Sequence, residues 1–93
     1  MGDLTDVVTA VALAERLRWL RRRQARERTD PPLTYRELGA RTGWAYSTVG
    51  LYLSGKVLPP TDRFDVLTDL LGAAPAERSA LAAARDRVEE RQR

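Results

Sequence analysis

The sequence predicts an all-α domain of five helices, and three observations support this fold class. Apolar residues recur at steps of three and four along most of the chain, which is the period of an amphipathic helix. Glycine and proline interrupt the pattern between successive helix-length segments. The alternating polar and β-branched or aromatic residues that are typical of strands are absent. We therefore expect residues 1–93 to form a single helical domain.

The first helix is expected from about Asp6 to Glu27, where an apolar stripe follows the helical period. The stripe consists of Val7, Val11, Ala14, Leu17 and Leu20. We expect Asp3 or Thr5 to cap its start, because such side chains accept hydrogen bonds from the free amides of a first turn. The pair Pro31-Pro32 excludes a continuation of this helix.

The second helix is expected to begin at Thr34. Thr34 and Glu37 have the spacing of a capping box, in which each side chain accepts a hydrogen bond from the backbone of the other residue. The helix should end near Arg41. Gly43 then permits the positive φ that a tight turn requires.

The third helix is expected from Ala45 or Tyr46 to Ser54, with Gly55 closing it and Val49 as its buried anchor. A short helix, a glycine turn and a second short helix, with a small residue at their crossing, are typical of a helix-turn-helix. Here that small residue is Gly39. Residues 34–55 are therefore predicted to form this motif.

Two more helices are expected in the last third of the chain. The fourth should run from about Asp62 to Leu71 with Thr61 as its cap, and the fifth should begin near Pro75. The terminal residues 89–93 are all polar and are expected to fray. The two tryptophans, Trp19 and Trp44, are expected in the core.

Composition argues against catalysis. The chain has neither cysteine nor histidine, which excludes disulfides, thiol and imidazole chemistry and the usual zinc sites. Three aspartates, Asp62, Asp65 and Asp69, fall on one side of the predicted fourth helix, and we interpret them as a solvated face rather than as catalytic carboxylates. We expect a non-enzymatic protein with no cofactor, no metal and no small-molecule ligand.

No run of 18 apolar residues exists in the sequence, so we expect no membrane-spanning segment. Asp3 and Asp6 precede the first apolar residues, where a signal peptide would have positive charge. A cytoplasmic protein is therefore expected.

Positive charge is concentrated in the first two thirds of the chain. Residues 15–28 have seven arginines and two glutamates, a local charge of +5, whereas residues 59–93 have six arginines and seven acids, a local charge of −1. Such asymmetry fits a polyanion bound on one face. The same charge distribution is explained equally well by arginine-rich helices whose charges only keep the protein soluble.

The segment from residue 34 to residue 60 resembles the lambda repressor and Cro family, also called the XRE family. The matching positions are Thr34, Tyr35, Glu37, Leu38, Gly39, Gly43, Trp44, Tyr46 to Val49, Gly55, Lys56 and Pro59. Phe64, Leu67, Leu71 and Gly72 match the family's fourth helix, and residues 83–87 resemble small high-GC bacterial members. The sequence departs from the family at three positions: Gly39 replaces an alanine, Ala45 replaces a capping serine or glycine, and Tyr35 replaces a glutamine.

The resemblance implies a five-helix lambda-repressor-like DNA-binding domain whose third helix enters the major groove. The residues it implies at base edges are Tyr46, Ser47, Gly50 and Leu51. The residues expected near phosphates are Thr34, Tyr35, Arg36, Arg41, Thr48, Ser54 and Lys56. The arginines of residues 21–23 are expected to add longer-range attraction.

The function expected on this basis is sequence-specific binding of double-stranded DNA by a transcriptional regulator. A homodimer is one expectation, through residues that would serve equally well as core. Those residues are Leu4, Val7, Val8 and Val11, or the stripe Leu81, Ala84 and Val88. Two alternatives stay open: a protein-interaction module of antitoxin-like or regulatory type with the same fold, and the DNA-binding end of a longer protein.

Overall fold

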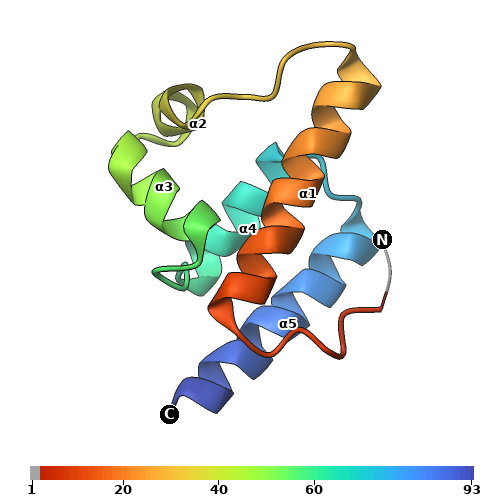
Figure 1. The fold of residues 1–93 in the computed structure, drawn as a ribbon, viewed down its shortest axis with the longest axis vertical. Helices are drawn as coiled ribbons and strands as arrows, with labels where there is room; N and C mark the ends of the chain where they lie inside the picture. Colours follow the sequence, from red (N-terminus) through yellow and green to blue (C-terminus); the bar gives the residue numbers. More distant parts are fainter. Residues whose placement is uncertain (1–2) are drawn as a thin grey trace.

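The computed structural model describes residues 3–93, and over that range it has five α-helices and no strand (Figure 1). The helices are α1 (Ala10–Arg28), α2 (Tyr35–Thr42), α3 (Tyr46–Ser54), α4 (Thr61–Leu70) and α5 (Pro75–Gln92). The predicted all-α fold of five helices is confirmed.

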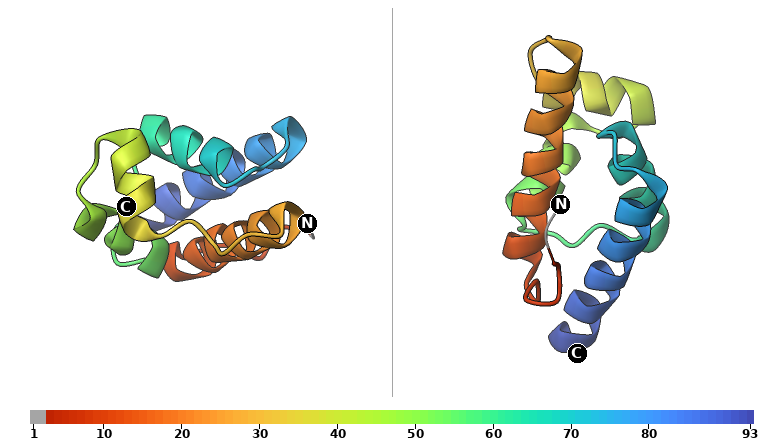
Figure 2. Two further views of the ribbon diagram at one scale, coloured as in Figure 1. Left: turned by 90° about the horizontal axis from the view of Figure 1, so that it is seen from above. Right: turned by 90° about the vertical axis from the view of Figure 1, so that its right-hand side faces the viewer.

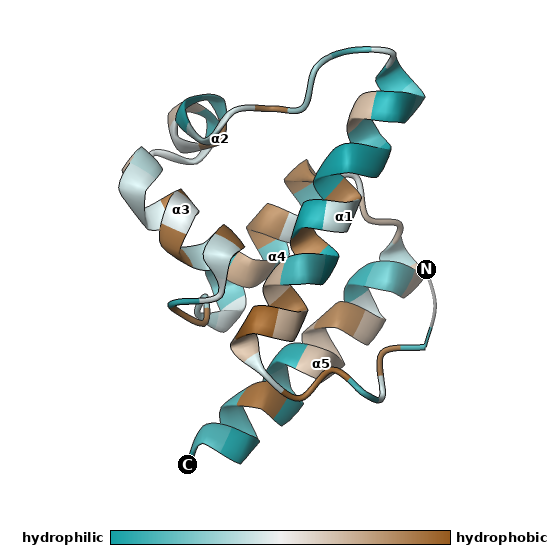
Figure 3. Ribbon diagram, in the orientation of Figure 1, coloured by the Kyte–Doolittle hydropathy of each residue, from teal (hydrophilic) through white to brown (hydrophobic). Residues whose placement is uncertain are grey.

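The helices form two groups around one core. Figure 2 shows α2 and α3 together at one side of the molecule, with α1, α4 and α5 making up the rest. α3 packs against both α1 and α2, and α5 packs against both α1 and α4. The hydrophobic faces of the helices turn inward, while the C-terminal parts of α1 and α5 are hydrophilic (Figure 3). α3 is thus held from two sides.

α1 begins at Ala10, so the predicted start near Asp6 and the predicted caps Asp3 and Thr5 are wrong. Thr9 caps the helix instead, since its hydroxyl accepts a hydrogen bond from the amide of Ala12 at 3.1 Å. The segment before it is not helical.

Two apolar residues of this preceding segment are buried without belonging to α1. Leu4 and Val7 are 5% and 3% exposed, and a hydrogen bond of 3.0 Å joins the Val7 amide to the Leu4 carbonyl. Val11, which was predicted on the apolar stripe, is 55% exposed. The stripe of α1 therefore runs through Leu13 and Leu17 without Val11.

The last two helices differ from the prediction at their ends. α4 starts at Thr61 with Pro60 in the N-cap position, so Thr61 is the first helical residue rather than the cap. α5 continues to Gln92, and the predicted fraying of residues 89–93 is wrong. Glu89 forms ion pairs one turn away on both sides, with Arg85 at 3.0 Å and with Arg93 at 3.9 Å.

The stripe proposed for a dimer on α5 lies inside the chain's own core. Leu81, Ala84 and Val88 are fully buried. Together with the burial of Leu4 and Val7, this removes most of the apolar surface that the sequence offered to a second copy. Separately, none of the helices within residues 3–93 combines the length and apolarity needed to cross a bilayer.

α2 begins as predicted. The Thr34 hydroxyl accepts from the Glu37 amide, and the Glu37 carboxylate accepts from the Thr34 amide, both at 3.0 Å. Gly43 closes α2 with φ of 81° and Gly55 closes α3 with φ of 82°, both in the left-handed region that favours glycine. These local signals set the ends of both helices.

Gly39 brings α2 into backbone contact with the start of α3. A Cβ atom at this position would lie 2.6 Å from the Trp44 carbonyl oxygen and 3.4 Å from the Tyr46 amide nitrogen. No side chain larger than hydrogen fits there without a backbone shift.

Gly39→Ala is expected to lower the free energy of unfolding by up to about 2 kcal/mol, because overpacking of ~1–3 kcal/mol is only partly offset by the helix-propensity gain of ~1 kcal/mol. Gly50→Ala is the matched control, since a Cβ there would meet only the Tyr35 ring at 3.7 Å. That variant should be neutral or stabilised by up to about 1 kcal/mol. Urea denaturation of both variants tests this, and equal stabilities would contradict it.

Candidate nucleic-acid interface

The first turn of α3 leaves polar groups unused at the surface. Ala45, in the N-cap position, makes no side-chain hydrogen bond, and its carbonyl accepts from the amides of Thr48 and Val49 at 3.0 and 3.2 Å. The amides and hydroxyls of Tyr46 and Ser47 have no hydrogen-bond partner within the described chain. Both side chains are exposed, Tyr46 by 51%. The positive end of the helix dipole is therefore at the surface beside two free hydroxyl groups.

The opposite side of α3 is fixed in the core. Val49 and Leu53 are fully buried, as predicted for Val49, and Tyr52 is 5% exposed. The Arg18 guanidinium donates to the Leu53 carbonyl, which ties the end of α3 to α1. The Arg63 guanidinium donates to the Tyr52 hydroxyl at 3.2 Å. The exposed residues of α3 are therefore presented on a rigid helix.

The role of the arginine that links α3 to α1 was not predicted from the sequence. Arg18 was counted only as part of the basic charge of residues 15–28. One signal was available: Arg18 follows Leu17 and lies four residues after Ala14, so it borders the apolar stripe. A long charged side chain at such a position can extend along the core to a carbonyl.

Two further residues predicted at base edges lie along the same helix. Leu51 is 39% exposed. Gly50 is half-buried, and the ring of Tyr35 lies in front of it, 3.7 Å from the position that a Cβ atom would take. A Cβ atom on residue 50 would thus make only an ordinary van der Waals contact with Tyr35.

The start of α2 offers two further free amides. The capping box uses the amides of Thr34 and Glu37, whereas those of Tyr35 and Arg36 have no partner within residues 3–93. The amide of Thr34 and its side chain hold the pKa of Glu37 below its ordinary value. The ionised carboxylate of Glu37 therefore lies beside the free amides of Tyr35 and Arg36. These two amides are themselves suited to bind an anion.

The remaining residues predicted near phosphates are dispersed. The Ser54 hydroxyl donates to the Leu51 carbonyl at 3.1 Å and accepts from the Lys56 amide at 3.4 Å, so it closes the end of α3. Lys56 is exposed just beyond that end, and Thr48 is half-buried. Lys56 is thus the cation nearest along the chain to the C-terminal end of α3.

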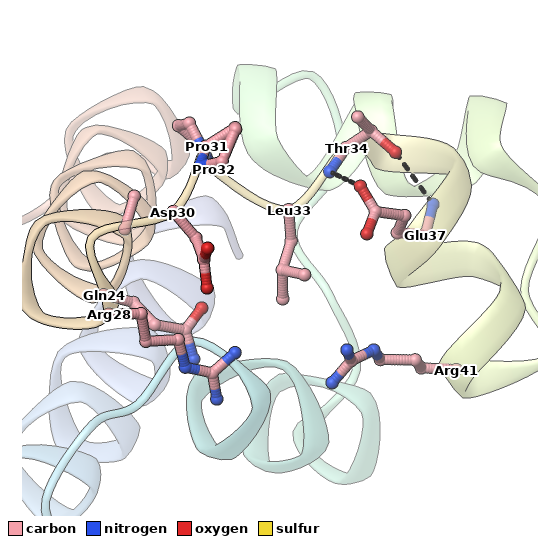
Figure 4. A pocket seen from close by; sticks show the side chains of 10 residues that line it. Gln24, Arg28, Asp30, Pro31, Pro32, Leu33, Thr34, Glu37 and Arg41 are labelled. Atoms are coloured by element: carbon pink, nitrogen blue, oxygen red, sulfur yellow. Dashed lines mark hydrogen bonds between the residues drawn. The ribbon is translucent and has the colours of Figure 1, made fainter.

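Arg41, near the end of α2, and Tyr46, at the start of α3, line different hollows of the surface. Arg41 lines a hollow between the end of α1, the loop after it and α2, opposite Arg28 (Figure 4). Leu33 and Asp30, from the loop, line the same hollow. Arg36, by contrast, lines the groove that contains Tyr46 and Trp44. The structure therefore separates Arg41 from the start of α3.

Most of the arginines expected to give longer-range attraction are used inside the fold. Arg21 donates from Nε to the Leu33 carbonyl at 2.7 Å, and Arg23 donates from both terminal nitrogens to the carboxylate of Glu77 at 2.7 and 2.8 Å. Arg22 remains exposed. The free basic charge of α1 is therefore smaller than the sequence indicated.

The tryptophans border the core instead of filling it. Trp44 is half-buried, with its ring edge-on to Tyr52 at a centroid distance of 5.9 Å and with the Arg63 guanidinium 5.0 Å from its centroid. Trp19 is also half-buried and contacts Arg23 in the same way at 4.9 Å. Neither ring is free to stack on a base.

One stacked pair lies at the surface where α2 and α3 both begin. The guanidinium carbon of Arg36 is 4.3 Å from the centroid of the Tyr46 ring. Both side chains are exposed. This contact therefore joins the first turn of α2 to the first turn of α3 at the surface.

A comparison with known families gives one match. The model of a helix-turn-helix domain matches residues 12–81, which include most of α1, all of α2 to α4 and the beginning of α5. No curated protein and no solved structure matches the chain. Since the matched segment is most of the 93 residues, the chain belongs to the helix-turn-helix domain family.

Proposed function

We propose that this protein binds double-stranded DNA in a sequence-specific manner and acts as a transcriptional regulator of the lambda repressor and Cro type. The observation that supports this most directly is the start of α3. Its Tyr46 and Ser47 side chains are exposed and their hydroxyls have no hydrogen-bond partner within residues 3–93, while the other face of the same helix is buried. Membership of the helix-turn-helix family agrees with it.

In the proposed complex, α3 lies in the major groove with its first turn toward the bases. The hydroxyls of Tyr46 and Ser47 donate to or accept from base edges, and Leu51 contacts a thymine methyl group. Gly50 lets the helix backbone approach. These contacts supply the sequence preference.

Phosphates on either side of the groove are bound at the two ends of this unit. At one end are the free amides of Tyr35 and Arg36 at the start of α2, beside Thr34. At the other end is Lys56, which is exposed just beyond the end of α3. These contacts place the domain on the duplex without selecting a sequence.

A helix of nine residues contacts few base pairs, so we expect two copies on a two-fold site. Val11 and Val57, which are 55% and 42% exposed, remain as apolar surface for such a contact. A palindromic sequence recovered from a randomised duplex pool would report this symmetry.

Tyr46→Ala and Ser47→Ala are each expected to weaken binding to a selected duplex by about 1–3 kcal/mol and to relax the preference at one base position. Fluorescence anisotropy with selected and scrambled duplexes measures both effects. Ser79→Ala is the control, because Ser79 is exposed on α5, away from α3, and should bind as the parent does. Unchanged affinity and preference in both α3 variants would contradict the base contacts.

The salt dependence of the parent protein separates this function from its main alternative. Binding to duplex DNA should fall steeply with salt, with a slope of about −0.9 per phosphate neutralised. Absence of binding to any duplex at low salt would favour a protein-interaction module with the same fold.

A further inference from the structure

Four arginines in residues 3–93 have their guanidinium groups over aromatic rings. The pairs are Arg36 on Tyr46 at 4.3 Å, Arg23 on Trp19 at 4.9 Å, Arg63 on Trp44 at 5.0 Å and Arg21 on Tyr35 at 5.4 Å. The first pair has the shortest distance of the four. It also joins the first turn of α2 to the first residue of α3.

The pair of Arg36 differs from the other three in its hydrogen bonding. Arg21 donates to the carbonyl of Leu33, Arg23 to the carboxylate of Glu77, and Arg63 to the hydroxyl of Tyr52. Arg36 makes no hydrogen bond and no ion pair with any residue between 3 and 93. Three of these arginines are therefore structural, whereas the donors of Arg36 are free.

The backbone geometry explains why this free guanidinium is held in place. Arg36 and Gly39 lie on the same side of α2, three residues apart. The close contact at Gly39 brings that side of α2 against the start of α3 and so places Arg36 over Tyr46. Stacking on a ring restricts the side chain before any ligand is bound, which reduces the entropy lost on binding.

We infer that Arg36 is a specificity-determining residue that binds the O6 and N7 edge of a guanine in the major groove, next to the base contacted by Tyr46. This inference rests on the proposed function, in which Tyr46 enters that groove. It reassigns Arg36 from the phosphate contacts that the sequence predicted.

Guanine is the base chemistry that fits. Its O6 and N7 are two adjacent acceptors, and a guanidinium can donate to both at once, which is the commonest specific contact between proteins and DNA. A phosphate contact can be made by a point charge such as Lys56 or by neutral donors such as the free amides of α2. The stacked and otherwise unpartnered guanidinium of Arg36 is suited to the bidentate contact.

The test begins with selection of duplexes from a randomised pool by the full chain. The parent protein should then prefer guanine at one position over the other bases by roughly 5- to 150-fold, the range that a bidentate contact supplies. Arg36→Ala should lose this preference while keeping the others, because it removes the planar pair of donors. Replacing that guanine by 7-deazaguanine should weaken the parent protein and leave Arg36→Ala unchanged. Arg26→Ala, at an exposed arginine on α1 outside the pair, is the control and should keep the guanine preference.

Two results would overturn the inference and leave the proposed function standing. One is a guanine preference that survives in Arg36→Ala. The other is an Arg36→Ala variant that is weakened equally on all sequences, with a salt slope reduced by about 1, as expected of a phosphate contact. Absence of any duplex binding by the parent protein would overturn both proposals together.

Discussion

Leu53→Ala is expected to lower the free energy of unfolding by about 2–5 kcal/mol. Leu53 is fully buried on α3, the helix that packs against both α1 and α2, so its truncation leaves a cavity in the core. A domain of this size has roughly 5–10 kcal/mol in total, and the variant should therefore be partly unfolded at moderate temperature. Urea denaturation followed by circular dichroism measures the change.

Leu51→Ala is the matched control for this prediction. It makes the same chemical change two residues earlier on the same helix, but Leu51 is 39% exposed. Its unfolding free energy should stay within about 0.5 kcal/mol of the parent. A comparable loss in both variants would show that α3 is not anchored by the buried face described above. In the proposed complex, the same Leu51 variant should bind duplex DNA more weakly.

The α2–α3 unit was predicted almost to the residue because its signals are local. The capping box of Thr34 and Glu37 spans one turn, and Gly43 and Gly55 mark ends through their own backbone conformation. Such signals depend on residues within three or four positions, so a single sequence contains them.

The start of α1 was predicted wrongly because it depends on contacts between distant parts of the chain. Leu4 and Val7 continue the helical period of α1 in sequence, yet they pack into the core from a non-helical segment. The Arg87 guanidinium on α5 donates to the Leu4 carbonyl at 2.7 Å, across 83 residues of sequence. Periodicity cannot distinguish such a segment from a further turn of helix.

The features of the candidate site also fall into those that depend on local sequence and those that depend on packing between helices. The exposure of Ser47, two residues before the buried Val49 on α3, could be predicted from helical spacing, whereas that of Tyr46, three residues before Val49, could not. The roles of the arginines could not be predicted, since they depend on which carbonyl or ring lies within reach after α1, α2 and α3 have packed. Arg18 and Arg36 have the same side chain, yet one is bound to a carbonyl and the other is free.

The ion pair of Arg23 and Glu77 should make stability depend on pH in the acid range. Two hydrogen bonds from Arg23, followed by one from the Ala74 amide at 2.9 Å, lower the pKa of Glu77 from 4.5 to about 2. The Glu77 carboxylate binds a proton more tightly in the unfolded chain than in the folded one. The free energy of unfolding therefore decreases as the pH falls. The contribution is complete above about pH 5 and disappears through pH 2.

Glu77→Gln is expected to lower the free energy of unfolding by on the order of 2–3 kcal/mol at pH 7. Both partners are largely buried, with side-chain exposures of 21% and 17%, so salt should screen the pair only in part. The difference between parent and variant should fall to roughly half or less by pH 3, because the parent's unfolded state is then protonated at Glu77. Urea titrations at pH 7, 4 and 3 measure it.

Glu27→Gln provides the internal comparison, since Glu27 approaches the same arginine at 3.7 Å but is 67% exposed. Its effect should stay below about 0.5 kcal/mol at every pH, as for most exposed ion pairs. A difference between the parent and Glu77→Gln that does not change with pH would contradict the charged pair as its source. The lower free energy of unfolding of Glu77→Gln would then come from the Ala74 hydrogen bond and from packing between α1 and the start of α5.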